Sequence, residues 1–180
     1  MTTENQKMPA AFIDRDGTLI EEVNFLSSVE GLRVFPYTAE ALQKLRSKGF
    51  RIIVVTNQSG IGRDIYDEVA MNSIHDEMQR QLDNAIDAFY HCPHLPCDGC
   101  QCRKPGLGMI EVAKRDFAIE MERSWMIGDK RSDAETGFNA GIRTAFVRTG
   151  YGKTHEAELK RQPDIIADDL LAAVDRILNL

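Results

Sequence analysis

Residues 10–18, AAFIDRDGT, join a short apolar run to two closely spaced aspartates. The run at residues 10–14 predicts a strand buried within a sheet. Side chains two residues apart on an extended chain point the same way, so Asp14 and Asp16 are expected to converge on one site. Gly17 permits a tight turn directly afterwards. The segment therefore predicts a strand that delivers two carboxylates to one edge of a sheet.

Strand-like and helical patterns alternate over the rest of the chain. The β-branched run RIIVVT at residues 51–56 is the strongest strand pattern. We expect one helix from Thr38 to a stop at Gly49, and a longer one over about residues 66–86, where apolar residues recur at every fourth position. Further strands are expected at residues 88–91, 124–127, 144–147 and 164–167, and further helices at residues 110–117, 132–140 and 170–178.

This alternation predicts a single α/β domain over residues 1–180. Strands that alternate with helices form a mainly parallel sheet covered on both faces, which is a three-layer, Rossmann-like arrangement. Ligands of such sheets bind at the carboxyl ends of the strands. Polar motifs follow several of the predicted strands, so we expect the functional site at that edge.

Composition excludes some classes of partner. The formal net charge of −6 argues against nucleic acid or an anionic membrane held by bulk charge. No apolar run approaches the roughly 20 residues that span a membrane, and the polar first ten residues lack the apolar core of a signal peptide. We therefore expect a cytoplasmic protein, a monomer, that acts on a small molecule.

Two carboxylates that converge need a cation to offset their repulsion. Mg²⁺ prefers hard oxygen ligands and commonly binds through one or two carboxylates plus a substrate phosphate. An isolated D-x-D would more simply be a solvated turn. Asp14 and Asp16, however, follow an apolar strand, and three further polar motifs follow later in the chain: TNQSG at 56–60, RKP at 103–105 and GDKRSD at 128–133.

In this order the four motifs resemble those of the haloacid dehalogenase (HAD) superfamily of phosphotransferases. The resemblance implies a HAD fold in which Asp14 is the nucleophile and Asp16 the general acid/base. It implies that Thr56 bonds the transferring phosphoryl group and that Lys104 neutralises its charge. The expected reaction is hydrolysis of a phosphate monoester through an aspartyl-phosphate intermediate.

The resemblance also implies a magnesium site. Asp14, the backbone carbonyl of Asp16, and Asp129 are the expected ligands, and Asp133 is expected to support them through hydrogen bonds. An acidic start to a helix would be the simpler explanation of Asp129 and Asp133 taken alone.

Three residues are candidates for binding substrate. Asn57 carries an amide donor after the second strand, Arg103 has a guanidinium that can grip a phosphate, and Lys130 follows Asp129 directly. A polar turn or a solvated basic pair would account for any one of them alone.

All four cysteines fall in the segment HCPHLPCDGCQC at residues 91–102. Such a cluster in a reducing compartment indicates a metal rather than disulfides, and structural Zn²⁺ takes four thiolate or imidazole ligands. We therefore expect a zinc-binding loop over about residues 91–105. The segment offers six candidate ligands, so the residues alone leave the set open.

The pattern C-x-H, then C-x-C and R-K-P, resembles one HAD branch, which contains D-glycero-D-manno-heptose 1,7-bisphosphate phosphatases and histidinol-phosphate phosphatases. The match implies that Cys92, His94, Cys100 and Cys102 bind the zinc. Cys97 is extra to the pattern and is an alternative to His94.

Substrate preference is divided between two members of that branch. The segments NQSGI and VRTG, at residues 57–61 and 147–150, resemble the heptose bisphosphate phosphatases, whereas the short loop between His94 and Cys100 resembles the histidinol-phosphate enzymes. We favour removal of the 7-phosphate from the heptose bisphosphate, with histidinol phosphate as the alternative. A zinc-bearing scaffold without catalysis is a third hypothesis. No large cap domain fits between the motifs, so we expect an open site.

Overall fold

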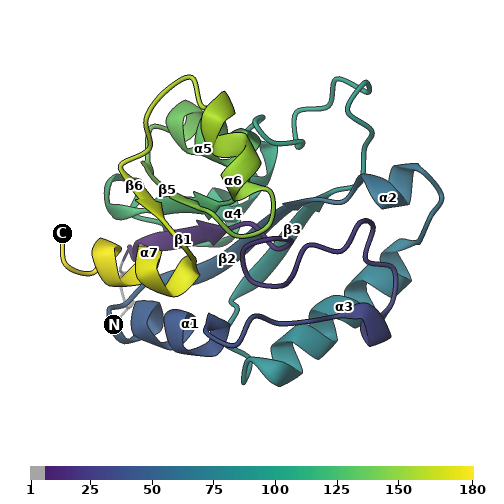
Figure 1. Cartoon of the computed structure of the whole chain (residues 1–180), viewed down its shortest axis with the longest axis horizontal. Helices are drawn as coiled ribbons and strands as arrows, with labels where there is room; N and C mark the ends of the chain where they lie inside the picture. Colours follow the sequence, from purple (N-terminus) through teal and green to yellow (C-terminus); the bar gives the residue numbers. More distant parts are fainter. Residues whose placement is uncertain (1–6) are drawn as a thin grey trace, which may run out of the picture.

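A computed structural model describes residues 7–180, and its centre is a six-stranded sheet (Figure 1). Every strand pairs parallel to its neighbours, in the order β3-β2-β1-β4-β5-β6. The strands are β1 (Ala10–Ile13), β2 (Arg51–Asn57), β3 (Ala88–Cys92), β4 (Trp125–Gly128), β5 (Arg143–Val147) and β6 (Ile165–Ala167). The predicted parallel sheet is therefore confirmed, and each end of a predicted strand lies within one residue of the observed end.

Helices cover both faces of the sheet. The α-helices are α1 (Thr38–Ser47), α2 (Ser59–Gly62), α3 (Glu68–Gln81), α4 (Gly108–Asp116), α5 (Arg131–Ala140), α6 (Gly152–His155) and α7 (Leu170–Ile177). Short 3-10 helices occupy Val29–Gly31, Met121–Arg123 and Glu156–Glu158. Residues of α1, α3 and α7 pack on one face, while residues of α4 and the end of α5 pack on the other.

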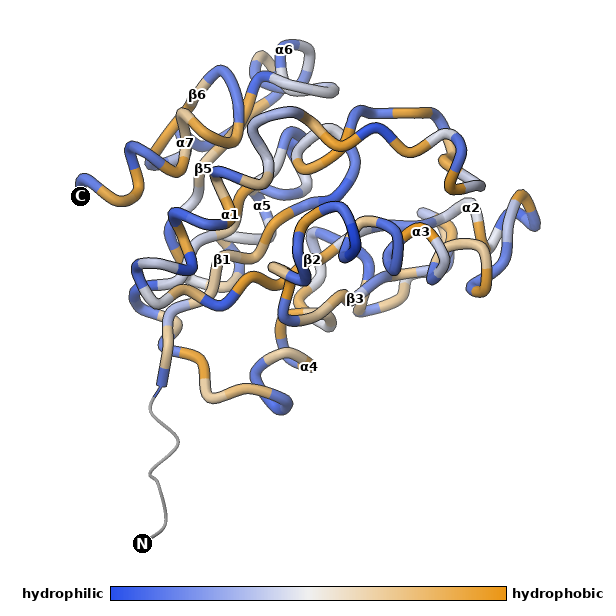
Figure 2. The backbone as a smooth tube through the Cα atoms, turned by 90° about the horizontal axis from the view of Figure 1, so that it is seen from below, coloured by the Kyte–Doolittle hydropathy of each residue, from blue (hydrophilic) through white to orange (hydrophobic). Residues whose placement is uncertain are grey.

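The first strand shows why its sequence is uniformly apolar. Ala11 and Ile13 pack toward α1, α3 and α7, whereas Ala10 and Phe12 pack toward α4. All four are fully buried. A parallel strand with helices on both sides has no solvent face, so alternation gives way to a continuous apolar run. In Figure 2, hydrophobic stretches run through the central strands, while hydrophobic and hydrophilic segments alternate along the helices.

The helix predicted over residues 66–86 is wrong in extent. It begins after Asp67, whose side chain caps the helix by accepting from the Ala70 amide at 2.8 Å. It ends at Gln81, because Asp83 and Asn84 adopt positive φ angles of 50° and 54°, which end a right-handed helix. Leu82 and Ile86 are still buried, so the apolar periodicity continued past the helix and concealed its end.

Candidate functional site

Two aspartates meet because their strands are neighbours. Ile13 of β1 pairs with Ile127 of β4, so the residues that follow these strands leave the sheet side by side. The Asp14 amide donates to the Ile127 carbonyl at 2.9 Å. Asp14 and Asp129 are therefore brought together across 115 residues of sequence, as the motifs predict.

Asp133 completes a buried acidic cluster. Asp14, Asp129 and Asp133 each offer an oxygen within 4.8 Å of the other two, and none is more than 2% exposed. Burial, reinforced by the charges of Asp14 and Asp133, raises the pKa of Asp129 to about 8. Such a cluster is costly unless a cation neutralises it.

The cluster fits a magnesium ion. Asp129 Oδ2 accepts from the Tyr151 amide at 2.8 Å, but Oδ1 is buried and meets no hydrogen-bond partner among the described residues. Asp133 Oδ2 accepts from the Lys130 amide at 2.9 Å, and its Oδ1 forms an ion pair with Lys104 Nζ at 2.6 Å. Asp14 and Asp129 are thus left as hard oxygen donors, which Mg²⁺ prefers, while Asp133 is held in place beside them.

Lys104 lies inside this cluster. Its Nζ is 2.9 Å from Asp14 Oδ1 and donates to the Val55 carbonyl at 2.8 Å. Burial opposes the charge of Lys104, but Asp133 and Asp14 outweigh it and raise the pKa of the amine. The lysine is therefore a fixed cation that touches the predicted nucleophile.

Asn57 holds the segment that carries Lys104. Its Oδ1 accepts from the Lys104 amide at 3.0 Å, and its Nδ2 donates to the Lys104 carbonyl at 3.3 Å. In this structure the Asn57 amide is thus engaged with backbone. Arg103, the preceding residue, is anchored likewise, donating to the His94 carbonyl at 3.2 Å.

Asp16 faces away from the acidic cluster and toward Arg15. The guanidinium donates to both carboxylate oxygens, at 3.0 Å each, and Gln58 Nε2 adds a third bond at 2.8 Å. The same Gln58 Nε2 lies 2.7 Å from the hydroxyl of Thr56, which is buried at the end of β2. Burial acts to raise the pKa of Asp16, but Arg15, Lys130 and Gln58 together hold it below its ordinary value.

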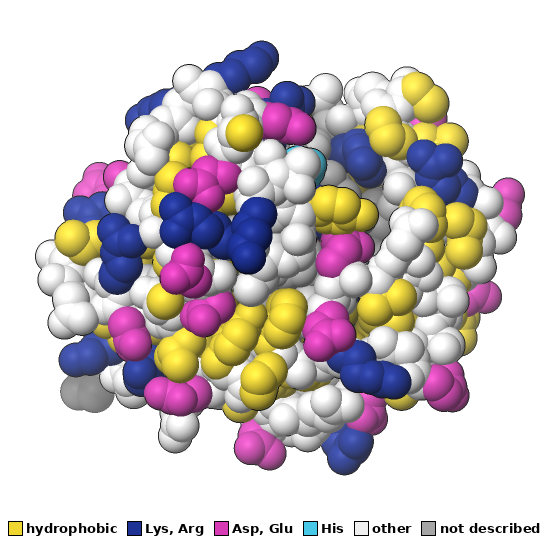
Figure 3. Space-filling model, viewed as in Figure 1, with side chains coloured by type: hydrophobic (Ala, Val, Ile, Leu, Met, Phe, Trp, Pro, Cys, Tyr) yellow, Lys and Arg dark blue, Asp and Glu magenta, His cyan; other side chains and the backbone are white. Residues whose placement is uncertain are grey.

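A polar cavity of about 90 Å³ opens beside these residues and is lined by Asp16, Asn57 and Lys130, among others. Lys130 Nζ lies 3.8 Å from Asp14 Oδ2 and 2.9 Å from Glu22. Burial opposes its charge, but Asp14 and Asp129 outweigh that effect and raise its pKa. Acidic and basic side chains are interspersed over the face drawn in Figure 3, in keeping with the modest net charge.

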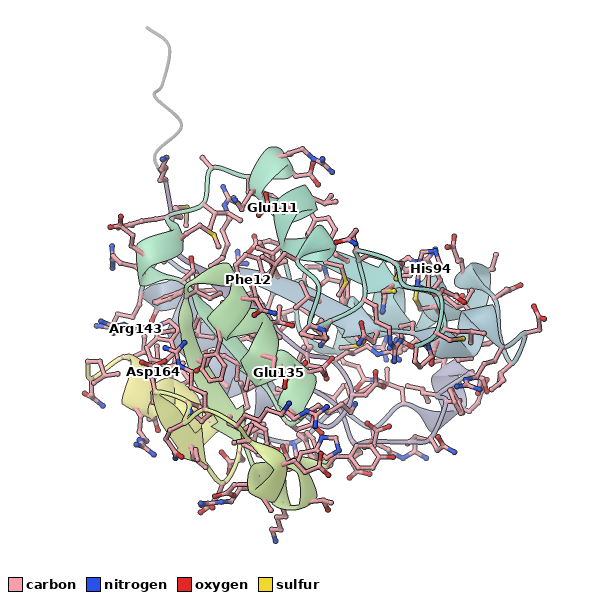
Figure 4. The ribbon with its side chains drawn as sticks, turned by 90° about the horizontal axis from the view of Figure 1, so that it is seen from above. Phe12, His94, Glu111, Glu135, Arg143 and Asp164 are labelled. Carbon is pink, nitrogen blue, oxygen red and sulfur yellow. The ribbon has the colours of Figure 1, made fainter. Side chains whose placement is uncertain are left out.

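The predicted zinc ligands also meet. Sulfur and nitrogen atoms of Cys92, His94, Cys100 and Cys102 lie 3.1–3.5 Å apart in their closest pairs, and sulfur-bearing side chains surround the labelled His94 in Figure 4. A tetrahedral Zn²⁺ with Zn–S bonds of about 2.3 Å separates its ligands by roughly 3.5–3.8 Å. The four atoms lie slightly closer together than this around one point, so they fit one such ion after a small outward shift.

Two other candidate ligands of that loop lie elsewhere. Cys97 is exposed, and its Sγ approaches Asp98 at 3.9 Å. His91 Nε2 lies 3.4 Å from Glu68. Of the two alternative ligand sets, the structure thus brings together the one that contains His94, and Cys97 lies outside it.

Sequence reasoning missed the residues around Asp16. Arg15, Gln58, Tyr66 and His75 form one hydrogen-bonded group there. Arg15 and Gln58 stand inside motifs already selected, so their position was a usable signal. Nothing in the sequence marks His75, which lies within the apolar face of α3.

Gly17 allows a test of how tightly the acidic cluster is enclosed. Its φ is +83°, and an added Cβ would lie 2.3 Å from Asp129 Oδ2. Gly17→Ala is therefore expected to lower the free energy of unfolding by about 2–4 kcal/mol and to weaken Mg²⁺ binding, measured by urea denaturation and metal titration.

Gly49→Ala is the matched control. Its φ of +79° imposes similar backbone strain, but nothing lies within 4 Å of the added Cβ. We expect the smaller cost of about 1–2 kcal/mol and unchanged Mg²⁺ binding. If both variants lost the same free energy of unfolding, backbone strain rather than contact with Asp129 would account for the loss.

The sequence of this chain is similar to those of known HAD-type phosphatases. The model of the HAD-hydrolase-like family matches residues 101–173. A D-glycero-alpha-D-manno-heptose-1,7-bisphosphate 7-phosphatase of Photorhabdus laumondii is 38% identical over 170 residues, covering 86% of this chain and 91% of that protein. The D-glycero-beta-D-manno-heptose-1,7-bisphosphate 7-phosphatase of Escherichia coli is 35% identical over 164 residues, covering 85% and 86%.

The fold is also similar to those of two solved heptose bisphosphate phosphatases. The D,D-heptose 1,7-bisphosphate phosphatase of B. bronchiseptica, complexed with magnesium and phosphate, superimposes with a TM-score of 0.89 at 30% identity, over 96% of this chain and 99% of that chain. The enzyme of the same description from Burkholderia thailandensis has a TM-score of 0.72 at 29% identity, over 96% and 99%. No helix among residues 7–180 has the length and apolar character to cross a bilayer.

Proposed function

Because this chain belongs to the HAD-like phosphatases, among relatives named as heptose-1,7-bisphosphate 7-phosphatases, we propose that it hydrolyses the 7-phosphate of D-glycero-D-manno-heptose 1,7-bisphosphate. The observation that carries the proposal is the meeting of Asp14, Asp129, Asp133 and Lys104 at one buried point beside a polar cavity. That arrangement binds a metal and a phosphate next to a carboxylate nucleophile.

Asp14 attacks phosphorus in the first step. Its Oδ1 is held by Lys104 Nζ at 2.9 Å and by the Arg15 amide at 2.8 Å, which leaves Oδ2 free to form the new P–O bond. The ester P–O bond breaks, and the sugar leaves as its alcohol. Asp14 and Asp129 would hold Mg²⁺. When bound, the ion would screen the repulsion between the Asp14 carboxylate and the substrate phosphate.

Asp16 handles the protons of both steps. It donates a proton to the departing sugar oxygen, and as a carboxylate it then takes a proton from the water that hydrolyses the aspartyl phosphate. Arg15 and Gln58 favour the carboxylate form in this structure. A bound phosphate dianion acts in the opposite direction, since a neighbouring negative charge favours the protonated acid. Substrate binding therefore favours uptake of a proton from solvent by Asp16, which then acts as the acid of the first step.

Two further cations near the site, Lys130 and Arg103, are candidates to bind the second phosphate of the substrate. Lys130 lines the cavity, and Arg103 stands next to Lys104 on the cysteine-rich loop. We assign them to the anionic groups of the substrate, in keeping with a bisphosphate rather than a monophosphate.

The test is a comparison of kcat/KM with Mg²⁺ for the two anomers of the heptose bisphosphate and for histidinol phosphate. We expect one heptose anomer to be preferred by at least about tenfold, because histidinol phosphate offers no second phosphate to Lys130 and Arg103. A preference for histidinol phosphate would overturn the assignment.

We propose Zn²⁺ as a structural cofactor, bound by Cys92, His94, Cys100 and Cys102. Its support is the spacing of these four atoms and the position of the loop. Arg103 follows the last cysteine and bonds the His94 carbonyl, so an ordered loop fixes the cations beside the catalytic site. We expect no redox or hydrolytic chemistry from it.

Elemental analysis tests the zinc site. Wild-type protein is expected to contain about one equivalent of zinc, and Cys102→Ser to lose most of it, with a weakened loop and lower activity. Cys97→Ser is the control, because Cys97 lies outside the cluster, and it should keep both metal and activity. Loss of zinc from Cys97→Ser, with retention in Cys102→Ser, would contradict this ligand set.

A further inference from the structure

Arg15 is an unusual residue to bury, and its contacts show what it does. Its side chain is 1% exposed, and four of its five N–H donors meet acceptors: two reach Asp16, one reaches Gln58 Oε1 at 2.9 Å and one meets His75 Nε2 at 3.2 Å. A buried guanidinium is stable only when such partners are supplied. The orientation of the Asp16 carboxylate is thus fixed through Arg15.

His75 supplies the contact that comes from farthest away. It lies on α3, where Met71, Ile74 and Met78 are fully buried and apolar. An apolar side chain at this place would pack at lower cost, so the imidazole calls for a polar reason. Its meeting with Arg15, across 60 residues of sequence, provides that reason.

The ring of His75 is held as an acceptor. It stacks on Phe89 of β3, with centroids 4.2 Å apart and planes 13° apart, so its nitrogen is aimed by packing. Burial, assisted by the Arg15 charge, lowers the pKa of His75 to about 3. The ring is therefore neutral at physiological pH and can accept from the guanidinium when its proton is on Nδ1.

We propose that His75 is a positioning residue for the proposed phosphatase reaction, acting through Arg15 to hold the carboxylate of Asp16 where it serves the leaving group. The inference rests on the proposed function, since it assigns His75 to the same site. Networks of this kind fix a catalytic side chain by locking the rotamers behind it. Without His75, Arg15 keeps its charge pair but loses the contact that fixes its outer nitrogen.

The experiment uses leaving groups that differ in their need for a proton. The sugar leaves as an alkoxide unless it is protonated, whereas p-nitrophenol leaves readily as its anion. Because kcat/KM covers only the steps through loss of the alcohol, it reports the use of Asp16 as an acid. For His75→Leu we expect kcat/KM for the heptose bisphosphate to fall about tenfold, while that for p-nitrophenyl phosphate stays within about twofold.

Two further variants test the role of the acceptor itself. His75→Gln can place an amide oxygen near the position of Nε2 and should restore most of the lost rate. His75→Asn is polar but too short to reach Arg15, so it should repeat the defect of His75→Leu even if the leucine variant folds poorly. Ile74→Val controls for loosened packing on the same helix, at about 1 kcal/mol, and should leave the ratio of the two rates unchanged.

The outcomes separate this inference from the function on which it rests. If the wild-type enzyme hydrolyses neither ester, the proposed function fails. If the wild-type enzyme is active but His75→Leu and His75→Asn lower both rates equally, or neither, His75 has a structural role only and the inference is overturned.

Discussion

Asp14→Asn is expected to lower kcat by at least about ten thousandfold, measured with the heptose bisphosphate and with p-nitrophenyl phosphate. An amide cannot attack phosphorus, and we assign the other carboxylates of the site to other tasks. Asp129 is the proposed Mg²⁺ ligand, Asp133 pairs with Lys104, and Asp16 is held by Arg15. The fold should persist, because the substitution removes one of three clustered negative charges and keeps the shape of the side chain.

Asp116→Asn is the control for this loss. Asp116 is exposed at the end of α4, where it accepts from the Tyr90 hydroxyl at 2.6 Å. The activity of the Asp116→Asn protein should therefore match that of the wild type. Full activity in Asp14→Asn would remove the nucleophile from the account. A wild-type protein inactive on every phosphate ester with Mg²⁺ present would instead favour a scaffold that carries zinc but no catalysis.

Lys104→Met is expected to damage both stability and activity. It leaves Asp14 and Asp133 buried without their cation, which costs about 3–5 kcal/mol of unfolding free energy. It also removes the positive charge beside the transferring phosphoryl group, so kcat should fall about a hundredfold to a thousandfold. Urea denaturation and steady-state kinetics measure the two effects, and added Mg²⁺ should recover part of the stability, since it neutralises the same carboxylates.

Lys114→Met is the matched surface variant. Within residues 7–180, Lys114 pairs only with Glu111, on the exposed side of α4, and such pairs contribute about 0–1 kcal/mol. A Lys104→Met protein as stable as Lys114→Met would mean that the acidic cluster does not depend on its lysine.

The sequence predicted much of this site because parallel strands deliver their carboxyl ends to one edge. Asp14 follows β1 and Asp129 follows β4, and both strands were recognisable from their apolar runs. Their adjacency was not recognisable. It depends on the sheet order, in which β4 lies beside β1 although 111 residues lie between Ile13 and Trp125. Only the shared metal motif indicated that the two ends must meet.

The contact of His75 with the group around Asp16 was beyond sequence reasoning for a different reason. His75 reaches Arg15 only because α3 lies over β3 at one particular rotation, with the imidazole stacked on Phe89. Periodicity marks the buried face of a helix but not which strand residues it meets. The sequence likewise did not indicate that the Asn57 amide bonds the backbone of Lys104, a contact set by the loop after Cys102.

The most direct test is a crystal structure of the wild-type protein with Mg²⁺ and beryllium fluoride, which mimics a phosphoryl group on a carboxylate. We predict the fluoride complex on Asp14 Oδ2, with Mg²⁺ between Asp14 and Asp129 and Lys104 against the fluorines. A fluoride complex bound to any other side chain, or a magnesium ion that Asp129 does not ligate, would contradict the account.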